Sequence, residues 1–230
     1  MNSKTLSLIL SQSTTKDLHV IDASIPKSDY ISIDLSQSNP ALDTFDNSSS
    51  KAWDTYITNY LNTHNKQVAF GGYLERRNLY NRSAYFASKS QAEQRNIHLG
   101  LDLWCPVDTP VLACFDGTIH SFKNNTNFGD YGPTLILQHK INEVTFYSLY
   151  GHLSVASLLN LKVGQKVHQG DTIAYLGDAS VNGDYAPHLH FQIIKDIQDY
   201  VGDYPGVCSL NNLEFFKQNT INPEVVLGLE

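Results

Sequence analysis

The second half of the chain alternates short apolar stretches with turn residues. From residue 98 onward, segments such as "TLILQH", "VTFYSLY" and "HLHFQII" are separated by turns that contain glycine, among them Asp116-Gly117 and Gln169-Gly170. Closely spaced short segments of this kind are typical of strands joined by hairpins. No helical period runs between them. The sequence therefore predicts a mostly β fold with an antiparallel β-sandwich core.

The first 70 residues have a different texture. They are rich in Ser, Asn and Asp, and a helical period occurs in residues 52–64, carried by Trp53, Ile57, Tyr60 and Leu61. The serines of "NSSSK" directly before it are suitable N-caps. We therefore expect three segments: an N-terminal extension with about one helix (1–70), a β domain (71–200), and a C-terminal tail packed on the core (201–230).

Charge and cysteine content exclude some classes of protein. A net charge of −7 argues against a nucleic-acid partner, which requires a basic face. The three cysteines are odd in number and form no C-x-x-C pair, so we expect reduced thiols rather than a disulfide framework. They are Cys105, Cys114 and Cys208. Nothing in the sequence indicates an oligomeric state.

No stretch of the sequence predicts membrane insertion or export. The apolar run Leu6–Leu10 is interrupted by Ser7 and is shorter than the roughly 7–15 apolar residues of a signal sequence. No segment approaches the ~18–20 apolar residues of a membrane-spanning helix. We expect a cytoplasmic protein without a membrane partner, or a secreted or periplasmic one if the sequence is truncated.

Two of the nine histidines lie two positions apart in "HLHFQII", residues 188–194. On a strand, His188, His190 and Gln192 share one face, and the apolar residues between them face the core. Two imidazoles on one face can serve one metal ion or one proton-transfer site. The pair alone does not establish such a site, because an ordinary polar strand face would have the same residues.

Two further segments carry chemistry. In "HLGLD", His98 and Asp102 share a face of an extended segment, and Gly100 disfavours the helical alternative. Imidazole and carboxylate are both zinc ligands, although a polar strand edge would have the same residues. In "YGHLS", His152 follows an aromatic strand. The other histidines belong to no such motif and are expected to be structural or surface residues: His19, His64, His120, His139 and His168.

Together the three segments resemble the lysostaphin-type, or LytM-like, zinc metallopeptidases. The motifs of that family are H-x-x-x-D, a histidine in Y-x-H-L, and H-x-H, and this chain has "HLGLD", "YGHLS" and "PHLHF" in that order. The segments "DTPVLACFDGTI" and "VGQKVHQGDTIAYLGD" also resemble the glycine framework of the family. The resemblance covers residues 95 to 195.

The resemblance implies one Zn²⁺ per chain, bound by His98, Asp102 and His190, with a fourth position open as in catalytic zinc sites. It implies that His152 and His188 are catalytic and activate a metal-bound water, without assigning which of them is the base. The expected activity is that of an endopeptidase that cleaves small, Gly-containing peptide bonds.

Other assignments stay open. The segments "GGYLERRNLY" and "GDYPGVCS" resemble peptidase-like domains of large intracellular proteins, so the alternatives are a hydrolase of a small amide or phosphorylated metabolite, or a binding module that retains its zinc site. Arg76 and Arg77 are candidates for binding an acidic substrate group through bidentate hydrogen bonds. The extension 1–70 is either a lid or plug over the zinc position or a packing appendage.

Overall fold

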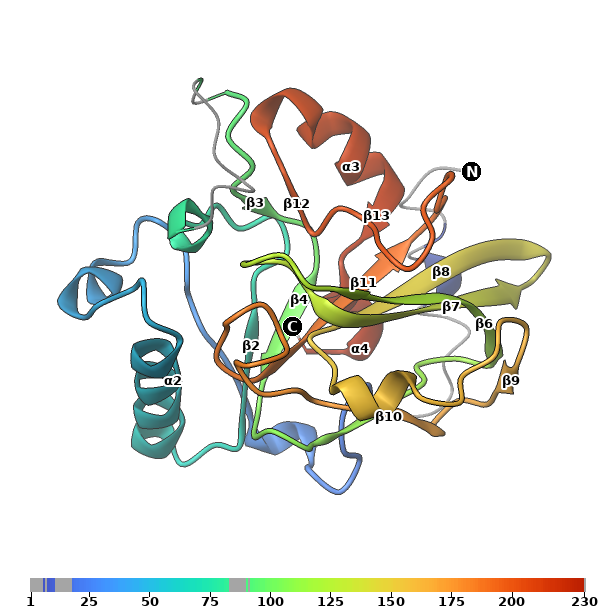
Figure 1. Ribbon diagram of the computed structural model, residues 1–230, viewed down its shortest axis with the longest axis horizontal. Coiled ribbons are helices and arrows are strands. Elements are labelled where there is room, and N and C mark those ends of the chain that lie inside the picture. The colour runs from blue at the N-terminus through green and yellow to red at the C-terminus, as the bar shows by residue number, and fades with distance from the viewer. Residues whose placement is uncertain (1–5, 7, 11–17, 83–89, 91, 230) are drawn as a thin grey trace.

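A nine-stranded sheet organises the molecule (Figure 1). The computed structural model describes residues 6, 8–10, 18–82, 90 and 92–229. The sheet order is β1-β2-β4-β11-β8-β7-β6-β9, with β13 pairing with β11. The bounds in chain order are β1 (Tyr30–Ser32), β2 (Val68–Gly71), β4 (Leu101–Trp104), β6 (Gly117–Asn125), β7 (Gly132–Ile141), β8 (Val144–Gly151), β9 (Lys166–Val167), β11 (His188–Ile194) and β13 (Thr220–Ile221).

The strands of this sheet are antiparallel except for the parallel pair β1–β2. Two small antiparallel sheets accompany it. One pairs β5 (Pro110–Leu112) with β10 (Thr172–Tyr175), and the other pairs β3 (Ile97–His98) with β12 (Val207–Cys208). The predicted mostly β fold is confirmed.

The helices are short, apart from α2 (Ser50–His64). It begins at Ser50, two residues before the predicted range, and one of the predicted serine caps is used: the Ser49 hydroxyl accepts a hydrogen bond from the Ala52 backbone N–H at 3.3 Å. It ends at Asn65, which adopts a left-handed conformation, and it buries Trp53 and Ile57. Further helices are α3 (Leu213–Asn219), α4 (Pro223–Leu227) and the 3₁₀ helices η1 (Lys27–Asp29), η2 (Pro40–Thr44), η3 (Leu79–Arg82), η4 (Val155–Leu158) and η5 (Leu210–Asn212).

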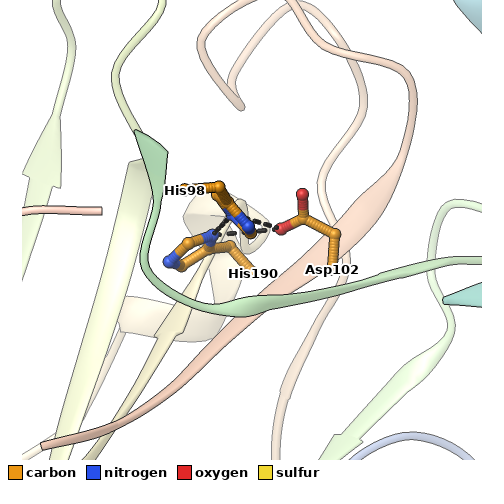
Figure 2. A group of neighbouring side chains, drawn as sticks. All are labelled: His98, Asp102 and His190. Carbon is orange, nitrogen blue, oxygen red and sulfur yellow. Dashed lines mark hydrogen bonds and ion pairs between the residues drawn. The ribbon is translucent and has the colours of Figure 1, made fainter. Parts of the chain in front are cut away.

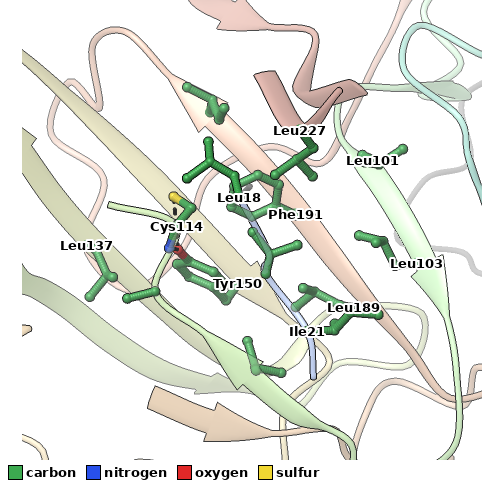
Figure 3. Packing of buried hydrophobic residues seen from close by; sticks show 14 of the residues in the cluster. Leu18, Ile21, Leu101, Leu103, Cys114, Leu137, Tyr150, Leu189, Phe191 and Leu227 are labelled. Carbon is green, nitrogen blue, oxygen red and sulfur yellow. Dashed lines mark hydrogen bonds between the residues drawn. The ribbon is translucent and has the colours of Figure 1, made fainter. Parts of the chain in front are cut away.

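The main hydrophobic core covers one face of the sheet. The alternate residues Leu189, Phe191 and Ile193 of β11 pack there against strands β4 and β8, as the period of two predicts (Figure 3). On the opposite face, α2 and Trp104 of β4 form a second apolar cluster, and Tyr131 and Tyr204 belong to a third. The polar residues of β11 therefore lie between two apolar walls.

Segments before and after the predicted β domain contribute to the same sheet. Strand β2 pairs with β4, and β13 pairs with β11, while Val226 and Leu227 of α4 are buried in the main core. Residues 1–5, 7 and 11–17 of the predicted extension lie outside the described residues. The division into three segments remains a prediction.

Two further expectations concern the cysteines and the membrane. The thiols are free and buried; they belong to Cys105, Cys114 and Cys208. Within the described ranges α2 is the longest helix, with 15 residues, and none of these helices has the length and hydropathy of a membrane crossing.

Candidate metal centre

Side chains from three strands, β3, β4 and β11, converge on the polar face of the sheet. His98 Nε2 lies 2.9 Å from His190 Nδ1 and 3.2 Å from Asp102 Oδ1, and His190 Nδ1 lies 3.0 Å from Asp102 Oδ1 (Figure 2). All three are buried, and these potential ligand atoms lie within 4.8 Å of one another. The three residues that the sequence predicts as metal ligands are thus brought together.

Strand register places these side chains. Strands β4 and β11 are antiparallel with Asp102 opposite His190, so the two side chains stand side by side on one face. His98 enters from β3, and Gly100 allows the chain to pass close to the imidazole of His190. A Cβ atom at Gly100 would lie 2.7 Å from Cε1 of His190, so a side chain there would collide with the ring.

The outer contact of each ligand fixes which atom faces the cluster. His98 Nδ1 donates to the Gly72 carbonyl at 2.9 Å, which leaves the lone pair on Nε2. His190 Nε2 donates to Gln192 Oε1 at 3.0 Å, which leaves the lone pair on Nδ1. Asp102 Oδ2 accepts a hydrogen bond from Arg77, and Asp102 Oδ1 faces the two histidines. Three lone pairs therefore point at one another.

This arrangement fits a bound cation. Two imidazole lone pairs 2.9 Å apart, with no proton between them, repel each other, and a metal ion between them removes that repulsion. Two imidazole nitrogens and one carboxylate oxygen form a donor set that zinc accepts, and a set of three leaves a fourth position open. The cluster is a candidate metal site.

His152 and His188 lie directly beside the cluster. Their ring centroids are 4.2 Å apart, and His188 Nε2 is 3.8 Å from Asp102 Oδ1. His152 Nδ1 donates to the Asn182 carbonyl and His188 Nδ1 donates to the Ala186 carbonyl, each at 2.7 Å. Because Nδ1 carries the proton in both rings, both Nε2 atoms are free to accept one.

Burial shifts the pKa values of three of these histidines. It lowers the pKa of His98 to about 4, and it lowers the pKa of His188 and, together with the neighbouring imidazoles, that of His152 well below its usual value. Burial alone would raise the pKa of Asp102, but its electrostatic interactions with His98 and Arg77 outweigh burial and hold that pKa well below the ordinary range. Neutral imidazoles and an ionised carboxylate are the forms that bind a metal.

A family match covers the segment that contains this group. Residues 96–201 match the sequence model of Peptidase family M23. This segment is an M23 domain.

Known proteins are similar over the same part of the chain. Glycyl-glycine endopeptidase ALE-1 of Staphylococcus capitis is 37% identical over 95 residues, which are 41% of this chain and 24% of that protein. Peptidoglycan DD-endopeptidase ShyA of Vibrio cholerae serotype O1 is 35% identical over 98 residues, 42% of this chain and 20% of that protein. The match therefore spans a fifth to a quarter of the length of these two curated relatives.

Among solved structures, the catalytic domain of the antimicrobial peptidase lysostaphin from Staphylococcus simulans is 28% identical. The match covers 54% of this chain and 81% of that chain, with a TM-score of 0.36. The curated relatives, named as peptidoglycan and glycyl-glycine endopeptidases, give no support to a cytoplasmic location. A secreted or periplasmic location is compatible with them.

The M23 domain holds His152 in an unusual backbone conformation. Its φ of +62° is left-handed, a conformation that costs a non-glycine residue on the order of 1 kcal/mol and that concentrates at functional sites. Two backbone hydrogen bonds impose it: His152 N–H donates to Tyr131 O, and His152 O accepts from Gly177 N–H, each at 2.9 Å. The ring is thereby turned toward His188.

A cavity of about 330 Å³ opens over the five residues. Its walls are largely aromatic and come from Trp53 of α2, Trp104, Tyr131, Tyr185 and Tyr204. Sequence reasoning missed these walls and also the role of Tyr131, whose hydroxyl lies 3.3 Å from His190 Nε2 and donates to Gln192 Oε1 at 3.1 Å. The alternation along β11 placed Gln192 on this face, but no sequence signal pointed to Tyr131.

The two arginines predicted to bind substrate occupy different positions. Arg77 lines the cavity but is buried, with its guanidinium paired to Glu75 and Asp102. Arg76 is not among the described residues that line the cavity. Their binding of substrate stays a prediction, as does the lid or plug role of the extension, which contributes Leu35 and Trp53 to the cavity wall.

Proposed function

We propose that the M23 domain is a zinc-dependent endopeptidase that cleaves small, Gly-containing peptide bonds. One observation carries the proposal: three converging ligand lone pairs lie beside two imidazoles whose Nε2 atoms are free, all within one cavity. His98, Asp102 and His190 would bind the ion. When bound, zinc polarises a carbonyl group and lowers the pKa of water toward about 7.

The two catalytic histidines would move the protons of hydrolysis. A water oxygen adds to the carbonyl carbon of the scissile bond while Nε2 of one imidazole accepts the proton that it loses. As the C–N bond breaks, the same proton passes to the leaving amine. The second imidazole donates a hydrogen bond to the developing oxyanion when it is protonated. The Asn182 and Ala186 carbonyls keep both rings oriented throughout by accepting from Nδ1–H.

The cavity and the relatives support a peptide substrate. A volume of about 330 Å³ with aromatic walls accepts a short extended segment, and glycine residues let its main chain approach the imidazoles without side chains in the way. One relative is named as a glycyl-glycine endopeptidase and the other as a peptidoglycan DD-endopeptidase, and the first name corresponds to a Gly-containing peptide. Peptidoglycan peptides are therefore the first substrates to test, and they accord with a secreted or periplasmic location.

The test is cleavage of pentaglycine and of purified peptidoglycan by the zinc-loaded protein, followed by mass spectrometry of the products. His188→Ala should keep zinc and lose turnover by about 10²–10⁴-fold, the usual contribution of a general acid or base. The matched control is His168→Ala, which removes a histidine whose side chain is 75% exposed and should leave turnover unchanged. Full zinc occupancy without cleavage of either substrate, or full activity in His188→Ala, would overturn the proposal.

A further inference from the structure

Arg77 contacts the candidate metal centre from behind. Its side chain is 1% exposed, and Nη1 donates to Asp102 Oδ2 at 2.5 Å. The other carboxylate oxygen, Oδ1, is the one that faces His98 and His190. Arg77 therefore binds the carboxylate oxygen that does not face the two histidines.

The guanidinium is itself held in place by a second carboxylate. Arg77 Nε donates to Glu75 Oε2 at 2.5 Å, and Glu75 Oε1 accepts the Leu35 backbone N–H at 3.0 Å. A continuous line of contacts thus runs from the backbone at residue 35 through Glu75 and Arg77 to Asp102. The two carboxylates flank one guanidinium, which offsets the cost of burying its positive charge beside the candidate metal centre.

The backbone and an aromatic ring leave space for the guanidinium. Its Cζ lies 5.5 Å from the Trp104 ring centroid. Gly72 has a φ of +112°, and a Cβ atom there would lie 2.0 Å from Arg77 Nη2 and 2.8 Å from His98 Nδ1. The carbonyl of the same glycine accepts from His98 Nδ1. Gly72 therefore lies where Arg77, which holds Asp102, approaches the carbonyl that holds His98, and a side chain at this position would collide with both.

We propose that Arg77 is a positioning residue for the metal centre. By occupying Oδ2 it holds Asp102 so that Oδ1 alone is presented to the ion, which keeps the carboxylate monodentate. A lysine cannot replace it, because only the planar guanidinium donates at fixed angles to Glu75 and Asp102 together. This role differs from the substrate binding predicted from the sequence, since Nε and Nη1 are directed at carboxylates of the chain. It rests on the proposed function in requiring that a metal binds.

The test measures metal binding in Arg77→Lys and Arg77→Met. Zinc affinity, determined by competition with a chelator, should fall about 10–100-fold in both, as is typical when an outer partner of a ligand is lost. The visible spectrum of the Co²⁺-substituted protein should also change, because a released Asp102 alters the coordination geometry. A merely structural role would lower the stability of the metal-free protein without moving that spectrum.

The matched control is Arg95→Met, which removes a guanidinium that lines the same cavity and donates to the Val207 carbonyl at 3.3 Å. It should leave the zinc affinity and the Co²⁺ spectrum unchanged. Glu75→Gln serves as a second variant, because it keeps the Arg77–Asp102 pair and weakens only the contact of Arg77 Nε with residue 75. We expect a smaller drop in affinity for it than for the Arg77 variants.

The outcomes separate this inference from the proposed function. If the wild-type chain binds no metal, both are overturned. If it binds zinc and the folded Arg77 variants bind equally well with an unchanged Co²⁺ spectrum, only the role of Arg77 is overturned. Should Arg77→Met fail to fold, Arg77→Lys and Glu75→Gln decide, and wild-type affinity and spectrum in both would overturn the inference.

Discussion

The two faces of the central sheet each bury a histidine network. The networks differ in whether the lone pairs of their members accept hydrogen bonds. On the cavity face, the lone pairs of His98 and His190 point at one another and at Asp102. On the core face, His139 stacks on Phe146, donates from Nδ1 to the Asp116 carbonyl at 2.9 Å, and pairs through Nε2 with the Ser148 hydroxyl at 2.6 Å.

Each polar side chain of the core-face network has a hydrogen-bond partner, so the network is closed. Ser148 Oγ, whose proton goes to His139 Nε2, lies 3.2 Å from Tyr150 Oη, and the Tyr150 hydroxyl donates to Cys114 Sγ, also at 3.2 Å. Burial lowers the pKa of His139 to about 4, the same value as for His98. A depressed pKa therefore does not distinguish the two histidines. What distinguishes the candidate metal centre is that lone pairs of His98, His190 and Asp102 point at one place beneath a cavity with no proton between them.

The largest expected effect comes from removing a ligand. His190→Ala should abolish stoichiometric zinc binding, because two donors remain where a catalytic site needs three. Zinc retained after dialysis, measured by mass spectrometry, tests this. His139→Gln removes the buried histidine of the other face and should retain zinc fully. Full zinc occupancy in His190→Ala would show that the cluster is not the metal site.

The next effect is the pH dependence of stability, which His139 should dominate on the core face. Its folded pKa of about 4 lies below its unfolded value of 6.5, so between these values the unfolded chain binds more protons. The contribution of His139 to stability should therefore fall as the pH drops from 6.5 to 4 and change no further below that. The loss amounts to about 3 kcal/mol.

Urea unfolding of the metal-free protein between pH 7 and pH 4 measures this loss, and His139→Gln should reduce it. The site histidines are common to both proteins, so their contribution cancels in the difference. Equal pH slopes for wild type and His139→Gln would contradict the assignment.

A smaller effect is expected for Ser148→Ala. The substitution leaves His139 Nε2 buried without its partner, which should cost about 1–3 kcal/mol of unfolding free energy. Zinc affinity should stay at the wild-type value, because Ser148 lies on the core face. Urea unfolding and chelator competition on the same samples check both expectations. A loss of zinc affinity would mean that the two faces are coupled.

The smallest effect is expected for Cys114→Ala. The thiol accepts one hydrogen bond from Tyr150, and losing it should cost about 1 kcal/mol, again without a change in zinc affinity. Burial raises the pKa of the Cys114 thiol to about 12, so it should react with alkylating reagents after unfolding and not before. Rapid alkylation of Cys114 in the native protein would contradict the closed network.

The sequence predicts what local periodicity and short motifs encode. The alternation in residues 188–194 correctly placed Leu189 and Phe191 in the core and His188 and His190 on the polar face. The helical period of Trp53 and Ile57, with a serine before it, predicted α2. The resemblance to the lysostaphin-type family implied the three residues that converge, and the register of β4 and β11 places two of them, Asp102 and His190, opposite each other.

Long-range side-chain contacts could not be predicted in this way. Tyr131 and Arg77 contact residues of the candidate metal centre across 59 and 25 residues of sequence, and nothing in their local pattern marks those contacts. The left-handed backbone of His152 depends on hydrogen bonds to distant loops. The His139 network was missed for the same reason: its members share a sheet face but no motif.

The most direct test of the central claim is the metal content of the protein, purified without a chelator or a histidine tag and measured by inductively coupled plasma mass spectrometry. Convergence of His98, Asp102 and His190 predicts about one zinc ion per chain. A metal-free chain, even after incubation with excess zinc, would contradict the claim that this group is a metal centre.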